Sequence, residues 1–118
     1  MNLFEKITEI YLNEEFWHDK KLSREEANEY HRRMLLNGNI LTVSDGETLA
    51  GYCEYFIQDG VCFINSLYIK EGYRGKKVIW MLKKRLFQVA RGCRIFLGER
   101  NKFNMKYPEA QLRSQHGI

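Results

Sequence analysis

The sequence has few cysteines and no long apolar run, and each shortage excludes a class of protein. It contains one proline and three cysteines, and no apolar run reaches about 18 residues, the length that a membrane-spanning helix needs. Cys53, Cys62 and Cys93 are odd in number and match no zinc or redox spacing, so we expect reduced, mostly buried thiols. The acidic residues Glu5 and Glu9 come early, and no basic segment precedes an apolar one as in a signal peptide. We therefore expect a cytoplasmic protein without a metal site.

The composition that remains is that of a folded protein. Hydrophobic residues make up 44% of the chain and aromatic residues 14%, which excludes a disordered chain. A length of 118 residues is enough for one hydrophobic core. We expect a single domain that spans residues 1–118.

Charge is distributed unevenly along the chain. Residues 1–60 hold 12 acidic and 6 basic residues, a net charge of −6, whereas residues 61–118 hold 3 and 13, a net charge of +10. Together they give the overall +4. A basic second half attracts phosphate groups, nucleic acid or an acidic protein partner, although a solvated basic surface has the same composition.

Two helices are predicted before residue 39. Apolar residues recur at helical spacing from Phe4 to Tyr11. Ser23 and Glu26 form a capping box that opens the second helix, and Asn37-Gly38 ends it. The second helix is expected to bury Ala27, Tyr30, Met34 and Leu35, and to direct His31, Arg32 and Arg33 towards its polar face.

Three antiparallel strands are predicted next, over residues 39–44, 48–57 and 61–69. Asp45-Gly46 fits a type I′ turn, and Asp59-Gly60 is expected to form a second two-residue turn. A two-residue second turn sets the pairing of the second and third strands. The expected pairs are Phe56 with Phe63, Glu54 with Asn65, and Tyr52 with Leu67.

A helix and a fourth strand complete the expected order. The helix runs from Lys77 to Ala90 and buries Val78, Met81, Leu82 and Leu86. Residues 93–97 form a short apolar strand, and this spacing predicts a right-handed crossover that places it parallel to residues 61–69. Residues 109–113 are expected to form a short helix after Pro108.

The segment from residue 67 to residue 79 joins a strand, a glycine-containing basic loop and a helix. Amides at a helix N-terminus lack intrahelical partners, and the helix dipole adds partial positive charge there. Gly75 permits close approach of a ligand, and Arg74, Lys76 and Lys77 add full positive charges. The segment therefore predicts a phosphate-binding site.

This segment also carries a family resemblance. Tyr-Arg-Gly-Lys at residues 73–76, after Leu-Tyr-Ile at residues 67–69, resembles the acetyl-CoA loop of the GNAT superfamily of N-acetyltransferases. That loop usually reads Arg/Gln-x-x-Gly-x-Gly/Ala, and here Lys77 and Ile79 stand at its two glycine positions. The resemblance covers about residues 40–97. It implies an α+β fold of three α/β/α layers with trimmed terminal strands, as in some small proteins of tailed bacteriophages.

The resemblance implies a set of cofactor-binding residues. Backbone groups of Leu67 and Ile69 correspond to those that contact the pantetheine arm of acetyl-CoA. The amides of residues 73–78 (Tyr73, Arg74, Gly75, Lys76, Lys77 and Val78) correspond to those that hold the pyrophosphate, with help from Arg74 and Lys76. Lys77 either donates to a phosphate or fills the pocket and abolishes binding.

The resemblance also implies catalytic residues. Glu54 is the candidate general base, with Asn65 orienting it or a water molecule. Because Glu54 lies among aromatic residues, desolvation is expected to raise its pKa towards neutrality. Tyr107 follows the last strand and corresponds to the general acid that protonates the leaving thiolate.

Two classes of function remain open from the sequence. In the first, the protein transfers the acetyl group of acetyl-CoA to an amine. In the second, it is an inactive relative that binds nucleic acid or an acidic protein, with Trp80 and other aromatic residues stacking on bases. Trimmed terminal strands leave a sheet edge exposed, so a homodimer or a partner protein is expected in either case.

Overall fold

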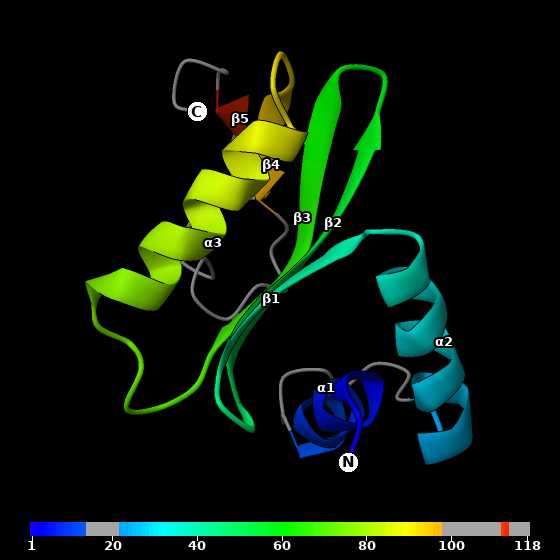
Figure 1. Ribbon diagram of the computed structural model, residues 1–118. Helices are drawn as coiled ribbons and strands as arrows, with labels where there is room; N and C mark the ends of the chain where they lie inside the picture. Colours follow the sequence, from blue (N-terminus) through cyan, green and yellow to red (C-terminus); the bar gives the residue numbers. More distant parts are fainter. Residues whose placement is uncertain (14–21, 98–111, 114–118) are drawn as a thin grey trace. The chain divides into compact units, whose positions relative to one another are not determined.

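The computed structural model of the protein describes residues 1–13, 22–97 and 112–113 (Figure 1). The backbone forms two compact units, residues 1–39 and residues 40–118. The first unit contains two helices, and the second contains the sheet and a third helix. In the described part of the chain, every helix is too short or too polar to cross a membrane.

The first unit is built from two capped helices, α1 (Leu3–Asn13) and α2 (Arg24–Leu36). The predicted capping box of α2 is confirmed, because the Glu26 N–H donates to Ser23 Oγ and the Ser23 N–H donates to Glu26 Oε1. Asn37 is the C-cap of α2, and Gly38 follows with a φ of +77°, the left-handed conformation that glycine adopts easily.

His31 does not lie on the polar face of α2, as the sequence predicted. Its side chain is buried, and Nδ1 lies 2.9 Å from the Oγ1 of Thr8, which is also buried. The rings of Tyr11 and Tyr30 contact the imidazole edge-on. His31 follows Ala27 by one helical turn and precedes Met34, so these three residues share one face. Tyr30 and Leu35, which were expected to be buried, are only partly so.

The buried His31 predicts a loss of stability in mild acid. Burial lowers the pKa of His31 from 6.5 to about 4. The unfolded chain therefore binds a proton more readily, and stability falls as the pH is lowered from 6.5 towards 4, by about 3 kcal/mol. Urea unfolding at a series of pH values measures this loss. His31→Gln removes the titrating group, and an equal loss of stability in that variant would contradict the assignment.

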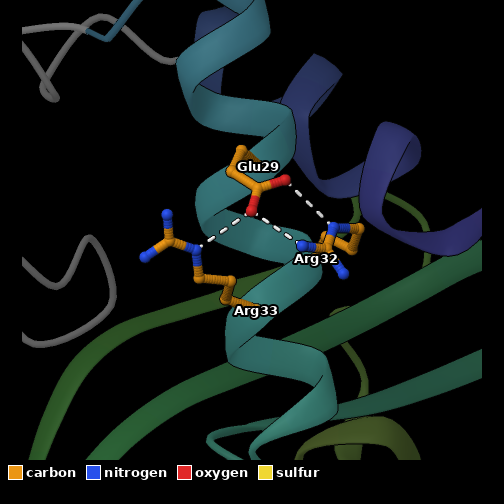
Figure 2. Close-up of polar contacts among 3 residues, drawn as sticks. All are labelled: Glu29, Arg32 and Arg33. Atoms are coloured by element: carbon orange, nitrogen blue, oxygen red, sulfur yellow. Dashed lines mark hydrogen bonds and ion pairs between the residues drawn. The ribbon is translucent and has the colours of Figure 1, made fainter.

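The exposed side of α2 carries a cluster of one acid and two arginines (Figure 2). Arg32 donates to both carboxylate oxygens of Glu29, at 3.0 and 2.7 Å, and Arg33 Nε donates at 3.0 Å. These hydrogen bonds lower the pKa of Glu29 to about 2. Exposed ion pairs add little stability, so this cluster is expected to contribute little to the stability of the fold.

The second unit is a five-stranded sheet in the order β1-β2-β3-β4-β5. Its strands are β1 (Ile40–Asp45), β2 (Thr48–Gln58), β3 (Val61–Ile69), β4 (Arg94–Leu97) and β5 (Leu112–Arg113). β1, β2 and β3 are antiparallel, and β4 is parallel to β3. The predicted strand–helix–strand crossover is confirmed, and the first four strand boundaries lie within one residue of prediction.

Helix α3 (Lys76–Val89) connects β3 to β4 and packs on one face of the sheet (Figure 1). The core between them is made of buried apolar side chains: Leu41, Val43, Ala50, Cys53, Tyr55, Cys62, Ile64, Ile69, Val78, Leu82, Leu86, Ala90, Cys93 and Ile95. The three cysteines are free and buried, as predicted. Burial raises the pKa of Cys53, and raises that of Cys62 to about 12, so both thiols stay protonated at neutral pH.

The two hairpin turns differ. Asp59 and Gly60 both have positive φ, as a type I′ turn requires, and Gln58 pairs with Val61. The type I′ turn predicted at Asp45-Gly46 is wrong, because Asp45 pairs with Thr48 and the loop residues are Gly46 and Glu47. Of these two, only Gly46 has a positive φ, which is the pattern of a type II′ turn.

The chain after β4 also differs from prediction. Residues 112 and 113 form the strand β5, antiparallel to β4, so the short helix predicted over residues 109–113 does not include them. Ile95 pairs with Arg113 and Phe96 with Leu112. β5 therefore pairs with part of the edge of β4 that was expected to be exposed.

The pairing of β2 with β3 shifts by one residue in the middle of the hairpin. Phe56 pairs with Phe63 as predicted, but Glu54 pairs with Ser66 rather than Asn65, and Tyr52 pairs with Tyr68 rather than Leu67. The cause is a β-bulge at Asn65, which has no residue opposite it. The bulge lets Ile64, Leu67 and Ile69 all face α3, which regular alternation would forbid.

Candidate functional site

The strands β3 and β4 pair over only part of the length of β3. The pairs run from Val61 with Arg94 to Ile64 with Leu97, and β3 then continues to Ile69. The bulge at Asn65 begins where this described pairing ends. Past the bulge, β3 keeps β2 on one side, and within the described residues no strand pairs with its other side.

The backbone groups on this other side can be assigned from the hydrogen-bond pattern. The Lys70 N–H donates to the Ala50 carbonyl at 2.8 Å, towards β2. Because backbone direction alternates along an antiparallel strand, Tyr68 and Ser66 also face β2, whereas Leu67 and Ile69 face away from it. Arg74 Nε accordingly donates to the Ile69 carbonyl at 2.9 Å on that side. Leu67 and Ile69 therefore direct polar backbone groups to the side of β3 on which residues 61–64 pair with β4.

Hydrogen bonds from Tyr73 and Arg74 hold the loop between β3 and α3 in place. The Tyr73 N–H donates to the Lys70 carbonyl at 2.9 Å, across a turn in which Gly72 has a φ of +92°. The Tyr73 hydroxyl donates to Asp45 Oδ2 at 2.7 Å, which raises the pKa of Tyr73 and ties the loop to the β1–β2 turn. The third bond is that of Arg74, so its side chain holds the loop against the end of β3.

The N-terminus of α3 lacks the groups that usually stabilise a helix start. Gly75 is the N-cap and provides no side-chain hydrogen bond, and the first turn contains no acidic residue. It contains Lys77 instead, whose positive charge opposes the helix dipole. A phosphate would accept from the uncapped amides and offset this repulsion, so the residues present fit an anionic group.

The two residues at the family's glycine positions have different environments. Lys77 is exposed, so its side chain does not fill a pocket in the core. Ile79 packs against the core between α3 and the sheet. Close approach of α3 is permitted by Gly51 of β2, where a Cβ atom would lie 2.8 Å from the Tyr68 carbonyl oxygen and 3.0 Å from Val78. The start of α3 is therefore fixed by packing.

Glu54 lies on the opposite face of the sheet from the α3 core. Its side chain is 5% exposed, and the equally buried Ser66 donates its hydroxyl to Glu54 Oε1 at 3.2 Å. The rings of Tyr52 and Tyr68 stack beside this pair, with centroids 5.7 Å apart. Asn65 is exposed and lies on the bulge, so the predicted Glu54–Asn65 pair is replaced by Glu54–Ser66.

The sequence-predicted residues thus fall into three groups. Leu67, Ile69 and the loop at residues 73–78 lie together around the end of β3 and the start of α3. Glu54 lies one strand away from this edge. Tyr107 lies outside the described residues. The sequence analysis did not identify Ser66 or Asp45 as part of this region. The core-facing apolar residues of β3 switch from even positions (up to residue 64) to odd positions (from residue 67), and this switch was a signal for the bulge that places Ser66 opposite Glu54.

Comparison with known proteins identifies the family. Residues 4–107 match the model of the acetyltransferase (GNAT) family, which is most of the chain. The chain belongs to the acetyltransferase (GNAT) family, and its α+β fold is that of the family. No curated protein matches the chain in sequence.

Solved structures share the fold at low sequence identity. An N-acetyltransferase from Staphylococcus aureus Mu50 is 15% identical with a TM-score of 0.59, and the match covers 87% of this chain and 70% of that one. A putative acetyltransferase from Salmonella typhimurium, solved with its cofactor acetyl-CoA, is 18% identical with a TM-score of 0.54, covering 80% and 60%. The PaiA N-acetyltransferase from Thermoplasma acidophilum, in complex with coenzyme A, is 21% identical with a TM-score of 0.52, covering 88% and 79%.

Proposed function

We propose that this protein is an acetyl-CoA-dependent N-acetyltransferase that acts on an amine. The proposal rests mainly on two features that lie next to each other at one end of the sheet. One is the edge of β3 beyond its pairing with β4, and the other is the uncapped basic N-terminus of α3. We also propose that residues 1–118 form one domain, because the family match includes residues of both compact units.

Each part of this region has a proposed role in holding acetyl-CoA. The backbone groups of Leu67 and Ile69 bind the pantetheine arm along the edge of β3. The backbone N–H groups that follow Gly75 donate hydrogen bonds to the pyrophosphate. Arg74 acts by fixing the loop to the Ile69 carbonyl, and Tyr73 fixes it to Asp45, so both position the amides.

The exposed side chain of Lys77 is proposed to contact phosphate as a point charge. Lys77→Ala is therefore expected to weaken acetyl-CoA binding roughly tenfold, and the loss is expected to shrink at high salt. Calorimetric titration at two salt concentrations measures both effects. Lys83→Ala removes another exposed lysine of α3 and serves as the matched control. Tighter binding by Lys77→Ala would show that the side chain obstructs the site.

Glu54 is the proposed general base. Acetyl-CoA supplies an activated thioester carbonyl when it is bound. The hydroxyl of Ser66 holds one carboxylate oxygen of Glu54, and the carboxylate lies one strand from the edge of β3. Because Glu54 is buried, we propose that the proton of the amine reaches it through a water molecule. Tyr107 remains a predicted general acid, and its variant Tyr107→Phe is expected to slow transfer.

The activity is tested by the release of free coenzyme A from acetyl-CoA in the presence of a panel of amines. The panel includes polyamines, amino acids, aminoglycosides and lysine peptides. Amine-dependent release, together with an acetylated product in the mass spectrum, supports the proposal. Release that does not depend on any amine argues against acetyl transfer by this site.

A second candidate function is binding to nucleic acid or to an acidic protein without catalysis. It is favoured by α3, whose sequence KKVIWMLKKRLFQV contains no acidic residue. Affinity for nucleic acid would fall steeply with rising salt, because each phosphate contact releases counterions. Lack of any salt-sensitive retention on immobilised DNA or RNA would exclude the nucleic-acid form of this function.

A further inference from the structure

Trp80 is a large apolar side chain that the fold leaves exposed. Its side chain is 59% exposed, whereas Val78 and Leu82 on the other side of α3 are buried. Among the residues that the structure describes, Trp80 is not part of the core cluster between α3 and the sheet. An exposed indole offers a flat apolar surface on which a planar ring can stack.

Trp80 lies on the same face of α3 as Lys77, which belongs to the first turn of the helix. Lys77, Trp80 and Lys84 are spaced three and four residues apart, so they share one exposed face of the helix. Side chains on a helix lean towards its N-terminus, which directs the indole over the first turn. The Lys84 ammonium lies 5.1 Å from the centroid of the indole ring.

The distance along α3 from the proposed phosphate site to Trp80 is similar to the distance from phosphate to base in a nucleotide. Trp80 lies four positions after Lys76 in the helix, a rise of about 6 Å. In coenzyme A one ribose ring separates the pyrophosphate from adenine. We propose that Trp80 stacks on the adenine ring of acetyl-CoA and so makes the protein prefer the full cofactor to shorter acetyl thioesters. The inference rests on the proposed function, since it needs the pyrophosphate at the N-terminus of α3.

The contact with Lys84 does not account for Trp80 by itself. A cation near the ring at i and i+4 stabilises a helix modestly. It engages one side of the indole and leaves more than half of the side chain exposed. The exposed part is available to a planar base, and a nearby ammonium favours the phosphates that accompany it.

Calorimetric titration of the full chain with acetyl-CoA and with acetyl-4′-phosphopantetheine tests the inference. The second compound has the thioester arm but no adenosine. Trp80→Ala is expected to weaken acetyl-CoA binding about tenfold and to leave acetyl-4′-phosphopantetheine binding unchanged. Trp80→Phe keeps an aromatic ring and is expected to restore most of the affinity. Gln88→Ala, an exposed change two turns further along α3, is the control.

Other outcomes overturn the inference and separate it from the proposed function. If the wild type binds both compounds and Trp80→Ala changes neither affinity, or changes both equally, the adenine contact is wrong and acetyl-CoA binding stands. If the wild type binds neither compound, both proposals fail. Binding of a single-stranded oligonucleotide that is lost in Trp80→Ala, without acetyl-CoA binding, would assign Trp80 to nucleic acid.

Fluorescence gives an independent readout. The chain has two tryptophans, so Trp17→Phe leaves Trp80 as the sole indole. Stacking predicts quenching of this indole by coenzyme A and no quenching by 4′-phosphopantetheine. Equal quenching by the two compounds, or by neither at saturation, contradicts stacking.

Discussion

Gly75→Asp is expected to reduce the affinity for acetyl-CoA at least about 100-fold without destabilising the protein. Gly75 has a φ of −71°, and a Cβ atom there would meet no described residue within 4 Å, so the fold accepts a side chain. Aspartate is a good N-cap and would accept from the free amides of α3, a gain of about 0.5 kcal/mol. The same carboxylate would occupy the place of the phosphates and repel them.

Calorimetry and thermal unfolding of the same samples check both halves of this prediction. Gly75→Ser caps the amides without a charge and is expected to lose less affinity than Gly75→Asp. Gly75→Ala neither caps nor adds charge, and is expected to bind nearly as well as the wild type. Unchanged affinity in Gly75→Asp would mean that the phosphates bind elsewhere, whereas a large loss of stability would mean that the cap geometry is wrong.

Glu54→Gln is expected to lower kcat by about 100-fold to 1000-fold while acetyl-CoA affinity stays nearly unchanged. Glutamine has the shape of glutamate and can still accept from the Ser66 hydroxyl, so the sheet is expected to stay intact. It cannot accept the proton of the amine.

Steady-state kinetics with the identified amine measure kcat, and calorimetric titration measures the affinity for acetyl-CoA. Glu47→Gln changes an exposed glutamate in the β1–β2 turn and is the control. Ser66→Ala removes the hydrogen bond to the carboxylate and is expected to reduce kcat less than Glu54→Gln does. Full activity in Glu54→Gln would remove Glu54 from the mechanism.

Local patterns predicted most of the fold because each has one dominant physical cause. The capping box at Ser23 and Glu26 satisfies the first amides of α2, and both of its hydrogen bonds are present. Asp59-Gly60 adopts the positive φ values of its turn, which sets the pairing of Phe56 with Phe63. Helix α3 begins at Lys76, directly after Gly75 and one residue before the predicted start at Lys77.

Except for His31, the errors arise where tertiary packing overrides a local pattern. His31 is a different kind of error, because helical spacing itself puts it on the buried face with Ala27, where it meets Thr8. The bulge at Asn65 changed the partner of Glu54, since both Ile64 and Leu67 pack towards α3. The contact of Tyr73 with Asp45 joins residues 28 apart in sequence, and no local motif encodes it.

Titration of the wild-type protein with acetyl-CoA, with coenzyme A and ATP as controls, tests the central claim most directly. The site at the end of β3 and the start of α3 predicts saturable binding of acetyl-CoA and coenzyme A, with a Kd of roughly 1 μM. ATP, which has phosphates but no pantetheine arm for Leu67 and Ile69, is expected to bind much more weakly. Absence of binding at millimolar acetyl-CoA would contradict the claim.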